Sequence, residues 1–341
     1  FIESSITALV AGTVAKPLCV KNGVSREKLA YICDSTSAPI CSLIPLNAWG
    51  ALLLGLIVTA IDAQVISGDG ISLLIASIPF NFYSLFTLAI VLAVIFLNIN
   101  IGPMKHSNPV AYTMKHDETE IKASPYKMLL PILIMVLTVP VVLYVTGDGD
   151  IFKGSGSTSV YYAVIVTLFF MYLYYVPTKI LSHKNYFKGF YEGIGEMIPV
   201  GMIMLFALLI GKVIGDLGTA KYLAHLLTGN ISPLLMPVLI FLVASITAFS
   251  TGTSWGTFSI MMPIGLALAA TMDLHIPLVI AAVISGGIFG DHASPISDTT
   301  IISSMAAGCD HVEHVRTQLP YALIGGVLAS AAFIVAGWAT L

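Results

Sequence analysis

Long apolar runs separated by short polar segments constrain the fold of this chain more than any other feature. Residues 128–146 and 158–177 each approach the roughly 20 apolar residues that a helix needs to cross a bilayer. Hydrophobic residues make up 57% of the chain and charged residues only 10%, whereas soluble domains have about 25% charged residues. The runs are long and do not alternate as barrel strands do. We therefore predict an all-α, polytopic helical membrane protein.

Lysine and arginine residues predict how the spans are oriented. Two of the loops between apolar runs, 62–70 and 147–157, contain a single basic residue, Lys153. Four apolar runs separate these loops from the basic ones: 40–61, 71–101, 128–146 and 158–177. By the positive-inside rule, we expect a multi-pass protein of the cytoplasmic membrane with three cytoplasmic loops, at 20–30, 102–127 and 178–193.

The stretch Gly290–Thr300 interrupts the apolar pattern with two carboxylates, an imidazole, two serines, two threonines and a proline. A bilayer penalises each of these polar groups, so their density indicates a functional site. Six residues of this stretch offer the oxygen ligands that a hard cation such as Na+ prefers: Asp291, Ser294, Ser297, Asp298, Thr299 and Thr300. A surface loop with N-capping aspartates is the plainer alternative.

A carboxylate in a low-dielectric site resists ionisation, and a bound cation favours its charged form. One aspartate can therefore hold either a proton or Na+, which is the minimal chemistry of proton-coupled exchange. Asp298 is the first candidate for this exchangeable carboxylate, and Asp291 or Asp34 is the second.

A second polar segment, Asp34–Pro39, has a similar pattern of an acid, small hydroxyl residues and then Pro-Ile. Proline removes a backbone donor and disfavours helix at the residue before it, so Pro39 and Pro295 each predict a broken helix. Thr36 and Ser37 would supply further oxygens. The acid-to-proline spacing differs by one residue, so chance similarity is the alternative.

A third interruption, Ser250–Thr257, divides an apolar run at 231–272 that is too long for one crossing. Gly252 would break the helix, while Thr251, Thr253 and Ser254 would offer neutral oxygens. The alternative is a helix contact built from small residues, which membrane helices use widely.

Transporters are often built from inverted repeats whose broken helices meet near the midplane. We therefore divide the chain into residues 1–146 and 147–341. The first part would carry the break at 34–39 and the second the breaks at 250–257 and 291–300, and we predict that the three polar segments converge.

Other polar residues carry weaker signals. His311 and His314 lie one helical turn apart, but no second ligand set accompanies them. We therefore favour a polar interfacial helix, in which Arg316 pairs with an acid or reaches a head-group, over a metal site. An intramembrane enzyme using the segment Asp291–Ser294 would lack a third group to orient the base.

Two further sets of residues, charged residues within a predicted span and the cysteines, are interpreted from their sequence neighbours alone. Charged residues inside a predicted span are rare, and Glu196 and Lys212 are two of them. We expect one of the two to pair with Asp216 or to line the transport path. Four cysteines without CxxC spacing are expected to be free thiols: Cys19, Cys33, Cys41 and Cys309.

Several motifs together resemble the NhaC family of sodium/proton antiporters: Phe289–Thr300, Gly308–Tyr321, Ser250–Thr257, Ser25–Tyr31 and Asp34–Pro39. The resemblance implies an inner-membrane, inverted-repeat carrier. Family members usually have a longer amino-terminal part, and the chain opens on Phe1-Ile2-Glu3, so we expect part of the working fold to lie outside it. Members also exchange organic acids such as malate and lactate.

From the residues and the resemblance we expect a secondary transporter that exchanges Na+ for H+ by alternating access and needs no cofactor beyond the transported ions. The alternative is a Na+- or H+-coupled organic-acid exchanger, in which helix N-termini hold the carboxylate. Its cationic partners would be Arg316 and Lys212, and neither lies in a break. No basic tract indicates nucleic acid, and the sequence leaves a homodimer open.

Overall fold

The computed structural model describes residues 4–45, 47–107, 126–149, 154, 156–216 and 232–340. These residues are all-helical, without a strand, which confirms the predicted fold class. Five of their helices are long and apolar enough to cross a membrane, or up to seven if each of two bent helix pairs is one span. The structure therefore supports the predicted multi-pass membrane protein.

The first two helices are α1 (Ser4–Lys21) and α2 (Arg26–Leu43). The Ser25 hydroxyl caps α2 by accepting a hydrogen bond from the Lys28 backbone at 3.2 Å. The predicted helix break at 34–39 is wrong, because α2 continues through Pro39. A proline removes only one helical hydrogen bond, and helices packed among other helices tolerate that loss.

The helix ends instead at Leu43, two residues before a second proline, Pro45. Ile44 is extended, as the residue before a proline prefers to be. Asn47 then caps α3 (Ala48–Asp62) through a 2.9 Å bond from the Gly50 backbone, and α2 and α3 meet at 43°.

The apolar run at 71–101 was predicted as one span, but it is bent. It consists of α4 (Gly70–Ser77), the short helix η1 (Ile78–Phe80) and α5 (Phe82–Phe96), with a 45° bend at Asn81. The buried Asn81 side chain donates to Ser42 Oγ at 2.9 Å and accepts from Ser285 Oγ at 2.8 Å. This bend is therefore held by polar bonds to two other helices.

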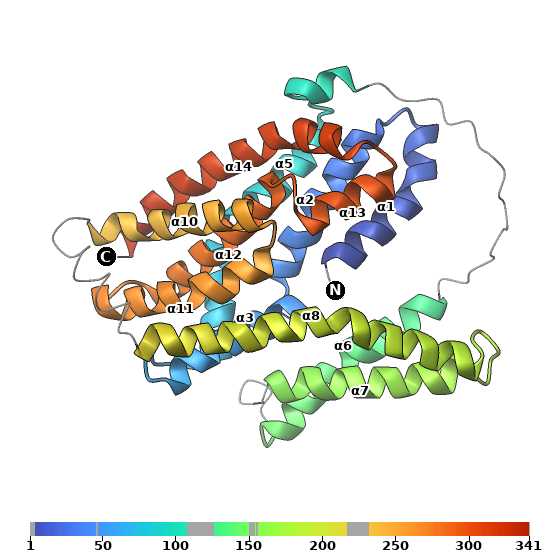
Figure 1. The fold of residues 1–341 in the computed structure, drawn as a ribbon, viewed down its shortest axis with the longest axis horizontal. Coiled ribbons are helices and arrows are strands. Elements are labelled where there is room, and N and C mark those ends of the chain that lie inside the picture. The colour runs from blue at the N-terminus through green and yellow to red at the C-terminus, as the bar shows by residue number, and fades with distance from the viewer. Residues whose placement is uncertain are drawn as a thin grey trace. The chain divides into compact units, whose positions relative to one another are not determined.

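The carboxy-terminal part contains α10 (Met236–Thr251), α11 (Ser254–Met272), α12 (Ile276–Ala293), α13 (Asp298–Ala307) and α14 (His311–Ala339). Helix α12 is central, since 83% of its span is buried and it packs against α10, α11, α14, α5 and α4 (Figure 1). Gly286 and Gly290 allow its backbone to approach that of α10 closely. Helix α13 packs against α1 and α2 and, with ten residues, is too short to cross a bilayer alone.

Two compact units are distinguished within the chain, residues 1–112 with 203–341, and residues 113–202. In the second unit, α6 (Tyr126–Thr146) and α7 (Gly156–Tyr175) pack together. Helix α8 (His183–Asp216) begins in this unit and ends in the first. The division into inverted repeats at 1–146 and 147–341 stays a prediction. Two short helices, η2 (Gly102–His106) and η4 (Pro233–Leu235), complete the first unit.

Candidate functional site

Two helix breaks lie within the polar stretches that the sequence singles out. Helix α12 ends at Ala293 and α13 begins at Asp298, so Pro295 lies in the break. Ser297 caps α13, because its hydroxyl accepts a bond from the Thr300 backbone at 3.5 Å. The four intervening residues thus leave one helix C-terminus and one helix N-terminus facing the same region.

The other break separates α10 from α11. Gly252 ends α10 with a left-handed φ of 65°, and Thr253 caps α11. The two breaks touch: a Cβ atom on Gly252 would lie 2.7 Å from the Ile296 carbonyl oxygen. The Ser294 hydroxyl also donates to the Phe249 carbonyl at 2.8 Å. The chain segments around 252 and 296 are therefore in direct contact.

Asp291 occupies the last turn of α12, at the junction of the two breaks. Its side chain is fully buried, and neither carboxylate oxygen has a hydrogen-bond partner among the described residues. The hydroxyl residues Ser254 and Ser297 and the carboxylates of Asp298 and Asp34 lie within its electrostatic reach. A buried, underbonded carboxylate among hydroxyl groups is an arrangement that a bound cation would stabilise.

Asp298, the first candidate from the sequence, lies in the first turn of α13 with an exposed side chain. Its Oδ1 accepts a bond from the Thr299 backbone at 2.8 Å. The buried Thr299 hydroxyl lies 3.1 Å from Ser297 Oγ. Asp298 is therefore at the edge of the site rather than in its interior.

Asp34 projects from the middle of the continuous helix α2 into a second polar cluster next to the breaks. Its carboxylate is fully buried. Oδ2 accepts bonds from Thr300 Oγ1 at 3.1 Å and from Gln318 Nε2 at 2.6 Å. The structure thus brings residue 34 and the stretch 291–300 together, although α2 is unbroken.

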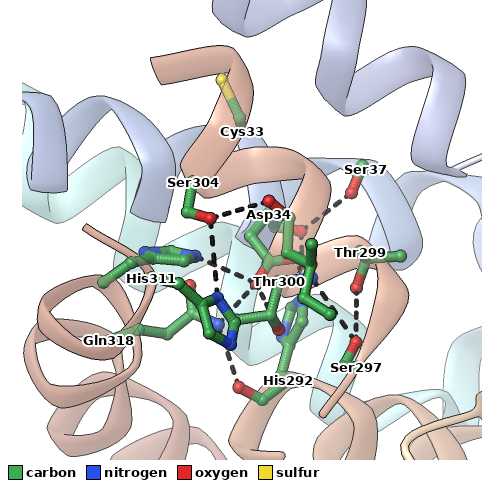
Figure 2. A network of polar contacts seen from close by, with 12 residues as sticks. Cys33, Asp34, Ser37, His292, Ser297, Thr299, Thr300, Ser304, His311 and Gln318 are labelled. Atoms are coloured by element: carbon green, nitrogen blue, oxygen red, sulfur yellow. Dashed lines mark hydrogen bonds and ion pairs between the residues drawn. The ribbon is translucent and has the colours of Figure 1, made fainter. Parts of the chain in front are cut away.

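Two imidazoles complete this second cluster. His292 Nε2 lies 2.9 Å from the backbone oxygen of Asp34, and its Nδ1 lies 3.2 Å from the Tyr83 hydroxyl. His314 Nε2 lies 3.4 Å from Asp34 Oδ2. Figure 2 shows Thr300, His292 and Gln318 gathered around Asp34. We define the Asp34 cluster as Asp34, His292, Thr300, His314 and Gln318.

Sequence reasoning missed three members of this cluster: His292, His314 and Gln318. Gln318 also donates to the His292 carbonyl oxygen at 2.9 Å. His314 and Gln318 are four residues apart and so share one face of α14. That spacing can be found in the sequence, but it does not show that the shared face packs against α2 and brings both side chains to Asp34.

The remaining predicted residues make local contacts. The Thr36 and Thr251 hydroxyls donate to backbone oxygens one turn earlier, at 2.7 and 2.9 Å. The buried Ser37 hydroxyl donates to the Asp34 carbonyl at 3.0 Å. Ser254 is buried at the start of α11. Of these residues, Ser254 is the one next to the buried Asp291 carboxylate.

The two histidines that lie one helical turn apart, His311 and His314, contact different residues. His311 Nε2 lies 2.6 Å from the Pro295 carbonyl oxygen, whereas His314 faces Asp34. Within the described ranges, no group of three His, Cys, Asp or Glu side chains could hold a metal ion. Arg316 pairs with Glu313 at 3.2 Å on the surface, so the predicted pairing with an acid is present. The predicted separate interfacial helix is wrong, because these residues form the first turns of the long helix α14.

The other residues singled out from the sequence lie away from the site or have side chains that the structure does not describe. All four cysteines are free thiols, which confirms that prediction. Burial raises the pKa of the Cys309 thiol, in the connector between α13 and α14, to about 12. The side chains of Glu196, Lys212 and Asp216 lie outside those that the structure describes.

Comparison with known proteins gives this geometry a family context. The family model described as the Na+/H+ antiporter family matches residues 40–338. An uncharacterized protein of Haemophilus influenzae is 36% identical over 99% of this chain and 69% of its own length.

Two other relatives match more locally. An uncharacterized Na+/H+ antiporter of Haemophilus influenzae is 33% identical over 43% of this chain and 31% of its own length. A malate-2H+/Na+-lactate antiporter of Bacillus subtilis is 30% identical over 46% of this chain and 34% of its own length. Each of these two matches thus covers less than half of this chain and about a third of the relative's own length.

The family match covers most of the chain, including both breaks and four of the five residues of the Asp34 cluster. The multi-pass helical fold and the buried polar site at its helix breaks agree with a transporter rather than an enzyme. This chain belongs to the Na+/H+ antiporter family.

Proposed function

We propose that the protein is a secondary transporter of the NhaC type, which exchanges Na+ for H+ across the cytoplasmic membrane by alternating access. One observation carries the proposal: the fully buried Asp291 carboxylate, without a hydrogen-bond donor among the described residues, lies where two broken helices meet. A charge in that position is costly unless a cation or a proton neutralises it.

The surroundings of Asp291 suit Na+. Hard cations prefer carboxylate, hydroxyl and carbonyl oxygens, and the hydroxyl residues Ser254 and Ser297 lie within reach of Asp291. The C-terminal ends of α10 and α12 both face the breaks, and the partial negative charge of a helix C-terminus favours a cation. We assign Asp291, Ser254 and Ser297 as the Na+ site, with Asp298 at its edge.

The test is ion exchange by the full-length gene product in proteoliposomes that contain a pH-sensitive dye. Adding NaCl outside should drive Na+ inward and H+ outward, so that the vesicle interior becomes alkaline. Choline chloride is the matched control salt. An interior pH that does not respond to NaCl would contradict the proposal.

A Na+- or H+-coupled organic-acid exchanger is the second candidate. The N-termini of α11 and α13 begin at the two breaks, and helix N-termini attract carboxylates. A relative named as a malate-2H+/Na+-lactate antiporter matches 46% of the chain. Among the described side chains, however, the breaks hold no arginine or lysine to pair with an organic anion. Proton movement that required malate or lactate in addition to NaCl would favour this candidate.

A further inference from the structure

His314 is a buried imidazole that the Na+ site does not use. It lies in the first turns of α14 and is fully shielded from solvent. Neither ring nitrogen has a hydrogen-bond partner among the described residues. Its Nε2 nonetheless lies 3.4 Å from Asp34 Oδ2, at ion-pair distance. A buried polar group left in this state calls for a functional explanation.

The Asp34 carboxylate is supported by neutral donors only. Thr300 Oγ1 and Gln318 Nε2 donate to Oδ2, while Oδ1 has no hydrogen-bond partner within the described part of the chain. A buried carboxylate with two neutral donors can persist, but a cationic partner would stabilise it further. One proton on His314 would create that partner, because Nε2 could then donate to Oδ2.

We propose that His314 and Asp34 form a proton-binding site separate from the Na+ site at Asp291. In the proton-loaded state, His314 is an imidazolium ion paired with Asp34. In the proton-free state, His314 is neutral and Asp34 keeps the bonds from Thr300 and Gln318. This inference rests on the proposed exchange of Na+ for H+, and it replaces one shared aspartate with two coupled sites.

Gln318 provides a structural connection between the two sites. Its Nε2 donates both to Asp34 and to the carbonyl oxygen of His292, the residue after Asp291. A change at the end of α12 when Na+ binds would therefore alter the donors around Asp34. The positive charge of Na+ acts in the same direction, because it disfavours a second cation nearby in a low-dielectric interior. Na+ binding should expel the proton.

Other titratable groups around His314 are few. From α2 it faces Asp34, and His292 of α12 lies 3.9 Å from the same carboxylate. The Tyr83 hydroxyl of α5 lies 3.2 Å from His292 Nδ1, and Tyr31 of α2 and Asp291 of α12 lie around Tyr83. Helix α10 carries no titratable residue, α13 carries only Asp298, and η2 carries Lys105 and His106. The remaining charged or titratable residues of α14 and its cap are Asp310, His311, Glu313, Arg316 and Tyr321. Of all these residues, only His292 and His314 combine burial with an imidazole next to Asp34.

The test counts protons and Na+ ions in the same sample. The purified full-length gene product in weakly buffered detergent receives radioactive NaCl, and a pH dye reports protons released. Replacing His314 by Gln should leave Na+ binding within about twofold of wild type and reduce proton release about tenfold. His311→Gln, on the same helix but facing Pro295, should release protons as wild type does. Wild-type proton release by His314→Gln would overturn the proposal.

Two further results separate this inference from the proposed function. Asp291→Asn should bind no Na+, and a wild type that binds no Na+ would refute the function itself. In that case the ring-nitrogen NMR signal of His314, identified by its loss in His314→Gln, still tests the proton site. A signal that changes with pH supports the site, and a signal that stays unchanged overturns it.

Discussion

The Thr300 hydroxyl donates a hydrogen bond to Oδ2 of Asp34 over 3.1 Å, and so joins the first turn of α13 to the middle of α2. The two residues are separated by 266 positions in the chain. This bond links the break at 294–297 to the Asp34 cluster, so its loss should affect the stability of both.

Replacing Thr300 by Val keeps the shape of the side chain and removes one of two donors to a buried carboxylate. We expect the free energy of unfolding to fall by about 1–2 kcal/mol, since bonds to charged groups exceed the average bond between membrane helices. Thr271→Val is the matched control, because the exposed Thr271 hydroxyl donates only to the Ala267 carbonyl within its own helix. Detergent-induced unfolding monitored by circular dichroism measures both variants, and equal losses would contradict the role of the Asp34 bond.

Gly252 should tolerate no side chain, for two reasons that can be separated. Its φ is 65°, and an added Cβ would lie 2.7 Å from the Ile296 carbonyl oxygen. Gly23 has a similar φ of 69° with nothing within 4 Å of an added Cβ, so Gly23→Ala measures the backbone cost alone, about 1 kcal/mol. Gly252→Ala should cost about 1–3 kcal/mol more. Similar thermal unfolding of the two variants would show that the breaks do not touch.

Cys309 should react slowly with thiol reagents despite its position in a connector. Burial raises the pKa of its thiol to about 12, so very little thiolate exists near neutral pH. In a variant with Cys19, Cys33 and Cys41 replaced by Ser, maleimide labelling at pH 7.5 should be about 10³-fold slower than at an exposed cysteine. The rate should rise about tenfold per pH unit up to pH 10.

An exposed reference for this labelling is available in Lys184→Cys, placed in the same background with Cys309 also replaced by Ser. Fast labelling of Cys309 at pH 7.5, close to the rate of that reference, would contradict the buried environment.

The sequence predicted the helical membrane fold because apolar run length and composition alone decide it. It located the breaks at Gly252 and Pro295 for the same local reason, since glycine and proline stand there among hydroxyl residues. The same rule failed at Pro39, where one missing backbone bond did not outweigh packing, and the chain turned at Pro45 instead. The bend at Asn81 was missed because its polar partners, Ser42 and Ser285, lie far away in the sequence.

The site was only partly predictable for a related reason. Asp291 and Asp298 lie in one polar stretch and look equivalent by composition, but the end of α12 is enclosed and the first turn of α13 is exposed at Asp298. His314 and Gln318 gain their role only from the packing of α14 against α2. Burial and long-range pairing are properties of the tertiary fold, and one sequence read locally does not contain them.

The central claim is that Asp291, rather than Asp298, is the carboxylate that binds Na+. The most direct measurement is Na+-driven proton movement in proteoliposomes with Asp291→Asn and Asp298→Asn side by side, both checked for wild-type thermal stability. Loss of a buried ion ligand should reduce the exchange rate at least about tenfold in Asp291→Asn, while Asp298→Asn stays within about threefold of wild type. Wild-type exchange by Asp291→Asn, with loss of exchange in Asp298→Asn, would contradict the account.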